Sequence, residues 1–263
     1  MSNINSENMN QLNQENDGFE NILSKSSLKT GRKFAAAVAD LTPGSIPDLS
    51  KGTLDVTKLS ANQINELAKG QLIDVYHGHV YIHSVPKRAF MALSTKANAL
   101  IKGKPAMDRI TIKEGGNASE IALFVILRCV EKVTVDIPFG RNFLECLQVY
   151  QAAHVLGMAQ HTSEVLKKLR VTVSARILSY AELGAVLKYC NPADPLFQHV
   201  AESLCYLRHQ KKIPDPADFA KYLEQHADLS KAMEAIDQKH RARRSGDRRP
   251  KLTNRSTSVS TSK

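Results

Sequence analysis

The apolar residues of this chain follow two periods, one typical of strands and one typical of helices. Between residues 72 and 83 β-forming residues dominate, so Leu72 to Tyr76 and His79 to His83 predict two strands. His77-Gly78 between them can form a tight turn, which predicts a β-hairpin. Residues 109–113 alternate polar and apolar side chains with a period of two and predict a third strand.

Helical patterns separate and follow these strands. Pro86 suits the first turn of a helix that we expect to run to about Leu100. Residues 119–130 are almost continuously apolar and predict a buried helix. The next helix, which Gly157 should cap, is marked by a stripe of residues at helical spacing: Phe143, Leu147, Tyr150 and His154.

Further helices are predicted toward the C-terminus. They are marked by Val165 to Leu169, Glu182 to Tyr189, Asp194-Pro195, Asp215-Pro216 and Leu229 to His240. In each Asp-Pro pair the Asp is a favoured N-cap and the Pro is favoured at the first helical position. The second half of the chain is therefore predicted to be helical almost throughout.

The composition of the two ends predicts tails around a folded middle. The first residues are rich in Asn, Gln, Ser and Glu, so we expect residues 1–60 to be disordered or loosely structured. A short helix capped by Ser60 is expected over residues 60–69. Residues 70–170 hold the predicted strands and their helices, residues 171–240 form a helical extension packed on them, and residues 241–263 form a disordered basic tail.

The positive charge of the chain is concentrated at its C-terminus. The 263 residues carry a formal net charge of +10. Residues 237–263 hold nine basic and two acidic side chains, so most of the excess lies in this short segment. The folded part is only mildly basic, which argues against a broad nucleic-acid-binding face on it.

Neither a targeting segment nor a membrane span is predicted. The start of the chain lacks the basic and apolar regions of a secretory signal and the Arg content of a transit peptide. The longest apolar run, Ile121 to Leu127, is much shorter than the roughly 20 residues of a membrane span. We therefore expect a soluble intracellular protein with no membrane partner.

The four cysteines predict no metal or redox motif. None of them forms a CxxC pair, and each lies in an apolar segment: Cys129, Cys146, Cys190 and Cys205. A reduced thiol in such a place behaves as a small hydrophobic side chain. We expect all four to lie in the core in a reducing compartment.

Few residues suggest catalysis or metal binding. His77, His79 and His83 alternate along extended chain and could share a metal, but a turn at His77-Gly78 would separate them, leaving exposed or half-buried strand histidines. Asp136 and Glu145 are single carboxylates with no acid or base partner nearby in sequence. No nucleophile elbow, phosphate loop, dinucleotide fingerprint or zinc-protease motif occurs, so we predict no catalytic residue, no metal and no cofactor.

The basic cluster near the C-terminus is a candidate nuclear localisation signal. It comprises two basic groups joined by a short spacer: Lys239, Arg241, Arg243, Arg244, Arg248, Arg249 and Lys251. Such a pattern suits an acidic receptor groove. The same charges could bind the phosphates of RNA or of anionic lipid, or could remain solvated with no partner.

The predicted order of a hairpin, a helix, a third strand and a run of helices resembles a BTB/POZ domain. Leu72-Ile73-Asp74-Val75, with Asp74 as its polar residue, resembles the family's opening L-x-D-V strand. His79 to His83 resembles its second strand, which ends in a His, and Ile110 to Ile112 takes the place of its third. The family's A-A-x-x-L-G-M helix end is matched here by a segment that closes on three residues: Leu156, Gly157 and Met158.

Two longer stretches are similar to divergent BTB-like proteins of filamentous fungi. One is H-V-Y-I-H-x-V-P-K-R-A, here His79 to Ala89. The other is I-P-D-P before a Phe-containing helix, here Ile213 to Phe219. The resemblance covers about residues 70–236. It implies an α+β, BTB/POZ-like fold with a small three-stranded sheet, a helical cluster and a C-terminal helical extension.

The function that this resemblance implies is a non-catalytic protein–protein interaction module, a scaffold or adaptor in the nucleus or cytoplasm. Its partners would be other proteins or a second copy of the chain. The alternative is a nucleic-acid-associated regulator that binds through the basic tail. A third choice is a cullin ubiquitin-ligase adaptor or an enzyme with a dispersed site. Cullin-binding members often carry a hydrophobic-x-Glu motif before the third strand, whereas Ile101 to Asp108 contains no Glu.

Overall fold

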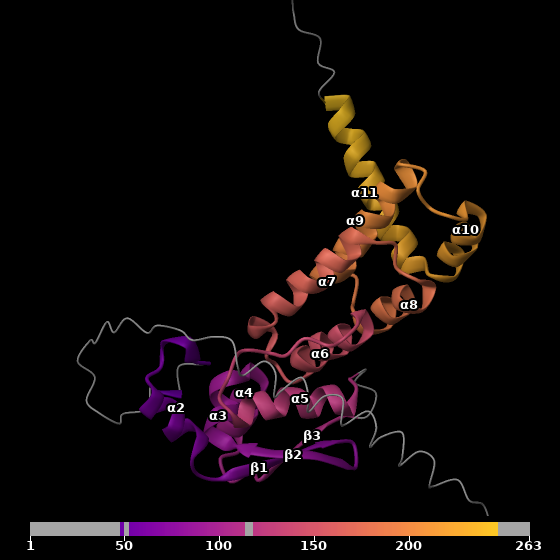
Figure 1. Cartoon of the computed structure of the whole chain (residues 1–263). Coiled ribbons are helices and arrows are strands. Elements are labelled where there is room, and N and C mark those ends of the chain that lie inside the picture. Colours follow the sequence, from indigo (N-terminus) through magenta and orange to yellow (C-terminus); the bar gives the residue numbers. More distant parts are fainter. Residues whose placement is uncertain (1–47, 50–52, 114–117, 247–263) are drawn as a thin grey trace, which may run out of the picture. The chain divides into compact units, whose positions relative to one another are not determined.

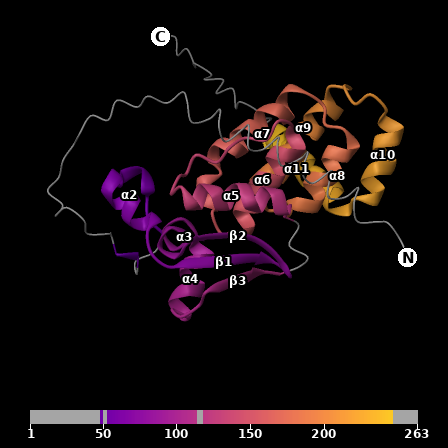
Figure 2. The ribbon, with the colours of Figure 1, turned by 60° about the horizontal axis from the view of Figure 1, so that its bottom comes forward.

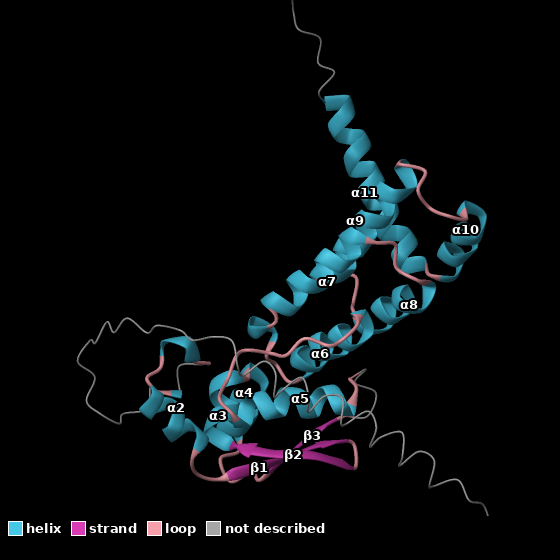
Figure 3. Cartoon of the chain, in the orientation of Figure 1, coloured by secondary structure: helices cyan, strands magenta, loops and turns pink. Residues whose placement is uncertain are grey.

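A computed structural model describes residues 48–49, 53–113 and 118–246 of the chain, the last four of them by backbone alone. Contacts within the chain divide it into two compact units, one ending at Asn191 and the other beginning at Pro192. Helices dominate both units, and the strands lie in the first (Figure 3). The predicted α+β class is confirmed.

The described part of the first unit contains one small mixed sheet. Its strands are β1 (Leu72–His77), β2 (Val80–Pro86) and β3 (Arg109–Ile112). Strand β1 lies in the middle, antiparallel to β2 and parallel to β3. The predicted hairpin and third strand are confirmed, with the turn one residue later than expected because Gly78, not His77, takes the left-handed conformation (φ 58°).

Within the described residues, three α-helices precede β3 in this unit (Figure 1). They are α2 (Ala61–Ala68), α3 (Lys87–Leu93) and α4 (Thr95–Gly103). Ser60 caps α2 as predicted. The single helix predicted from Pro86 to Leu100 is wrong, because the chain leaves the helical conformation at Ser94, whose side chain accepts a hydrogen bond from the Ala97 N–H and so starts a second helix.

The core of this unit lies between the sheet and the apolar helix α5 (Glu120–Glu131), which packs against β2 (Figure 2). Helix α6 (Phe143–Val155) packs on α5 in turn. Its predicted stripe is confirmed, since Phe143, Leu147 and Tyr150 are buried and His154 is half-buried. The 3-10 turn η3 (Ala159–His161) and two further helices follow: α7 (Ser163–Ala175) and α8 (Tyr180–Tyr189).

Part of the segment expected to be a loose tail belongs to the folded unit. The 3-10 turn η2 (Val56–Lys58) places Val56 in the core. The Leu54 N–H donates to the Ala92 carbonyl, and the Asn98 side chain donates to the Leu49 carbonyl. The prediction of loose chain up to residue 60 is therefore wrong from residue 53 onward, because Val56 supplies the apolar anchor. Residues 1–47 lie outside the described residues.

The second unit consists of three helices within the described residues. They are α9 (Pro195–His209), α10 (Pro216–Gln225) and α11 (Ala227–Gly246). Asp194 and Asp215 cap the first two as predicted. Helix α11 continues six residues beyond the predicted end at His240, so residues 241–246 are helical rather than disordered. Cations near a helix C-terminus interact favourably with the helix dipole, and Ala and Arg are good helix formers, so this segment continues the helix.

The predicted boundary between residues 170 and 171 falls inside helix α7. The compact units divide instead after Asn191, so α7 and α8 belong with the sheet. Helix α7 packs against α6, and its side chains Val165 and Leu169 are buried, so the chain does not divide at this helix. None of the helices in the described part of the chain is both long enough and apolar enough to cross a membrane.

Candidate interaction surface

The face of the sheet that points away from α5 carries a connected group of polar and aromatic side chains. In β1, Ile73 and Val75 are fully buried, whereas the alternate residues Asp74 and Tyr76 lie on the opposite face. Neither Figure 1 nor Figure 2 shows a described helix over this second face of the hairpin. The period-two pattern thus separates a core face from an open face.

Five residues on the open face touch one another across all three strands, and we call them the sheet-face cluster: Asp74, Tyr76, Tyr81, Ser84 and Arg109. The Arg109 guanidinium lies 4.0 Å from the centre of the Tyr76 ring. That ring meets Tyr81 edge to face, with ring centres 5.5 Å apart. The Tyr81 hydroxyl lies 2.8 Å from the Ser84 hydroxyl, which donates to the Asp74 carboxylate.

This arrangement holds an exposed aromatic surface in a fixed shape. Tyr81 is 51% exposed and Leu72, on the same face, is also exposed. Edge-to-face rings and a cation over a ring each contribute about 0.5–1 kcal/mol at a solvent-accessible site. Tyr and Arg are enriched in protein interfaces because they bring large area with little conformational freedom to lose. The cluster can therefore contact a partner without first being ordered.

The predicted motif residues of the hairpin separate in the structure. Asp74 belongs to the sheet-face cluster. His79 is exposed in the turn, whereas His83 points to the core face and lies 3.0 Å from Glu131 of α5. His77 lies 3.5 Å from a different residue of that helix, Glu120. The three histidines thus do not converge, and no group of residues in the described part of the chain is arranged to hold a metal ion.

Leu156, Gly157 and Met158 have a structural role. They follow α6 and attach it to the start of α4: the Ser94 hydroxyl donates to the Leu156 carbonyl, and the Thr95 N–H and hydroxyl both donate to the Gly157 carbonyl at 3.0 Å. Met158 is fully buried. None of the three presents a side chain to a partner.

The basic cluster begins on an exposed part of α11. Within the second unit, Asp237 binds Arg208 and His209 at the end of α9. Since α9 stops at His209, the residues of α11 after Asp237 continue beyond it, and Lys239 and Arg241 are exposed there. The side chains of Arg243 and Arg244 are not described, and Arg248, Arg249 and Lys251 lie outside the described residues.

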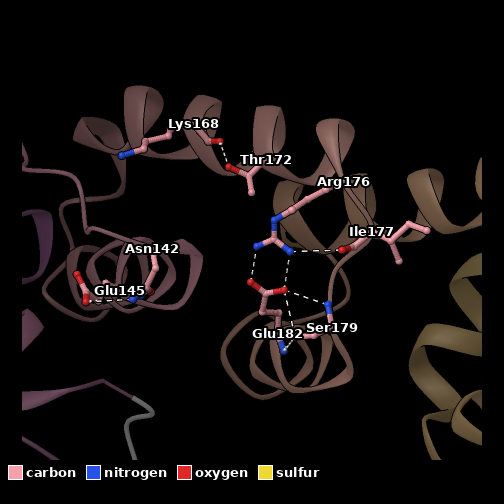
Figure 4. A network of polar contacts seen from close by, with 8 residues as sticks. All are labelled: Asn142, Glu145, Lys168, Thr172, Arg176, Ile177, Ser179 and Glu182. Atoms are coloured by element: carbon pink, nitrogen blue, oxygen red, sulfur yellow. Dashed lines mark hydrogen bonds and ion pairs between the residues drawn. The ribbon is translucent and has the colours of Figure 1, made fainter.

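The titratable groups around the start of α6 have structural roles (Figure 4). Glu145 accepts from the Arg141 N–H and from the Asn142 side chain, which fixes the first turn. Glu182 accepts two hydrogen bonds from Arg176, at 2.5 and 2.8 Å, which lower the pKa of its carboxyl to about 2. Asp136 is exposed and does not pair with Glu145.

The cysteines behave as core residues, as predicted. All four are free and buried. Burial raises the pKa of Cys129 to about 12 and that of Cys205 to about 11, so both thiols stay protonated at neutral pH. These thiols are not activated nucleophiles.

Sequence reasoning missed four of the five residues of the sheet-face cluster. Tyr76 and Arg109 belong to strands separated by two helices, and only the parallel pairing of β1 with β3 brings them together. A signal was present in the period-two pattern of the predicted strands, where Tyr76, Tyr81 and Arg109 each stand next to an apolar residue and so fall on the face away from the core. Comparison of the chain with family models, curated proteins and solved structures found no match in any of the three.

Proposed function

We propose that this chain is a non-catalytic protein–protein interaction module with a BTB/POZ-like core. The observation that carries the proposal is the sheet-face cluster, an exposed and internally braced patch with the side-chain types that dominate binding energy at interfaces. The order of elements also supports it, since a hairpin, helices, a third strand and a run of helices follow one another as the resemblance implies. A scaffold or adaptor that meets other proteins is the role that this surface serves best.

The experiment compares three forms of the full-length chain as bait in a nuclease-treated extract of the native organism. The first is unchanged, and the second carries Tyr81→Ala and Arg109→Ala. The third is a matched control with Val171→Ala, an exposed apolar residue of α7. Proteins retained by the first and third forms and lost from the second would support the proposal. Equal recovery by all three would show that the sheet face is not the binding surface.

A second candidate function is polyanion binding by the basic cluster. The specific observation in its favour is that α11 carries Lys239 and Arg241 past the end of α9 in exposed positions. Nucleic-acid affinity of the full chain should then fall with salt, and Lys239→Gln with Arg241→Gln should reduce the slope of log K against log salt by about one for each lost phosphate contact. An unchanged slope would exclude these two residues from phosphate contact.

A further inference from the structure

A pocket lined by four cations lies in the first unit, on the side of β1 where the strand begins. Its volume is about 610 Å³, and it is formed by the end of α2, the start of β1, α3 and α4. The cations are Lys69, Lys87, Arg88 and Lys102, and no acidic side chain is among the lining residues. The strand register brings the loop before β3 to the same place, so residues distant in sequence form one site.

Lys87 gives this pocket a fixed positive charge. The residue is only 8% exposed, and its ammonium group donates to three neutral acceptors: the Pro105 carbonyl, the Met107 carbonyl and the Gln71 side chain. These bonds hold the group in place, but none of them brings a counter-charge. Buried charged groups are normally paired with an opposite charge. Within the described residues no carboxylate forms an ion pair with Lys87.

The remaining lining residues extend this charge and add an apolar wall. Glu66 pairs with Lys69 at 2.7 Å and also interacts electrostatically with Arg88, which is exposed on α3. Beside the cations lie the apolar side chains of Met91, Ile101 and Pro105. A cleft lined by one sign of charge concentrates ligands of the opposite sign. Its volume falls within the range of about 300–1,000 Å³ that is typical of sites for drug-sized ligands, a size that a few residues of peptide match.

We propose that this basic pocket binds an acidic peptide segment of a partner protein, with an apolar residue beside the acidic ones. The carboxylates would face Lys87 and Arg88, and the apolar side chain would lie against Met91 and Ile101. Arg88 can bind a carboxylate with two parallel hydrogen bonds, and the fixed ammonium of Lys87 adds its field without being reordered. This inference rests on the proposed function, because it names the partner chemistry of the same interaction module.

The test uses a short fluorescein-labelled peptide of alternating glutamate and leucine, and the same peptide with glutamine for glutamate. Binding to the full-length chain is followed by fluorescence anisotropy. The pocket variant carries Arg88→Glu and Lys102→Glu. Its control carries Lys113→Glu and Lys212→Glu, two exposed lysines outside the pocket that change the net charge equally. Thermal midpoints of both variants are compared with the parent to show that they fold.

We expect the acidic peptide to bind the parent and the control alike, and the pocket variant about tenfold more weakly, while the glutamine peptide does not bind. Equal weakening in both variants, or equal affinity for the two peptides, would overturn the proposal. The variant with Tyr81→Ala and Arg109→Ala should bind the acidic peptide normally. If that variant loses its protein partners while the acidic peptide fails to bind the parent, the proposed function stands and the pocket assignment falls.

Discussion

Gly157 is the residue at which the end of α6 is attached to the start of α4. Its φ of 75° lies in the left-handed region, and a Cβ placed there would come within 2.8 Å of the Lys96 backbone nitrogen. We predict that Gly157→Ala lowers the free energy of unfolding by about 2–3 kcal/mol, through backbone strain and overpacking together. Urea denaturation followed by circular dichroism measures it.

Gly103 provides the matched control for this change. It is the last residue of α4, and a Cβ there would meet nothing within 4 Å. Gly103→Ala should leave stability unchanged or raise it by up to about 1 kcal/mol, because Ala has less freedom to lose on folding. Equal urea midpoints for the two glycine variants would contradict the structural role given to Gly157.

Glu182 makes stability depend on pH. Its folded-state pKa of about 2 is below the ordinary value of 4.5, and the largest cause is its hydrogen bonding to Arg176. A lowered carboxyl pKa stabilises the folded state above pH 4.5, and this contribution is lost as the pH falls from there toward 2. Glu182→Gln should therefore cost about 1 kcal/mol at neutral pH, a modest value because Arg176 is 45% exposed, and progressively less in acid.

The measurement is chemical denaturation of parent and variant between pH 3 and pH 7. The control is Glu164→Gln, since that exposed carboxylate lies 3.8 Å from Lys167 and forms no other ion pair with a described residue. The control should match the parent across the range. A stability difference for Glu182→Gln that stays constant with pH would show that its pairing with Arg176 does not lower the carboxyl pKa in the folded state.

Among the elements, the strands and helices with a clear hydrophobic period could be predicted, whereas a helix boundary set by a single side chain could not. The three strands and helix α5 follow from alternation and from continuous apolar sequence. The break at Ser94 was missed because a Ser within an apolar helical pattern has the same sequence signal whether it faces solvent or caps a new helix. The end of α11 was missed because its helical backbone continues beyond the last residue of its apolar stripe.

Helix α6 allows the predicted stripe to be tested directly. Leu147 is fully buried in the core between α6 and its neighbours, whereas Leu144, one turn earlier, is 38% exposed. Leu147→Asp should abolish cooperative folding or lower the free energy of unfolding by more than about 3 kcal/mol, because it buries an unpaired carboxylate. Leu144→Asp should cost less than about 1 kcal/mol. Thermal unfolding distinguishes them, and similar midpoints would show that the stripe is misplaced.

At the scale of the whole molecule, the position of the concentrated positive charge could be predicted from the sequence, but the candidate interaction surfaces could not. The concentration of cations after Asp237 is visible in the sequence alone. The sheet-face cluster and the basic pocket are not, because each depends on the parallel pairing of β1 and β3, which joins segments separated by two helices. Non-local pairing of this kind leaves no periodic signal in either segment.

We predict that the basic cluster directs nuclear import. Lys239 and Arg241 are exposed on α11, so a receptor groove lined with acidic residues can reach them without unfolding the second unit.

Residues 237–255 fused to a reporter too large to diffuse through nuclear pores should bring it into the nucleus. In the full chain, the five arginines at 241, 243, 244, 248 and 249 changed to Ala should leave the protein in the cytoplasm, since Ala removes the charge and, at positions 241, 243 and 244, favours the helix. The control changes five exposed lysines elsewhere to Ala, with an equal loss of charge: Lys113, Lys132, Lys167, Lys212 and Lys231. A cytoplasmic reporter, or equal relocation of the arginine variant and the lysine control, would show that these arginines are not an import signal.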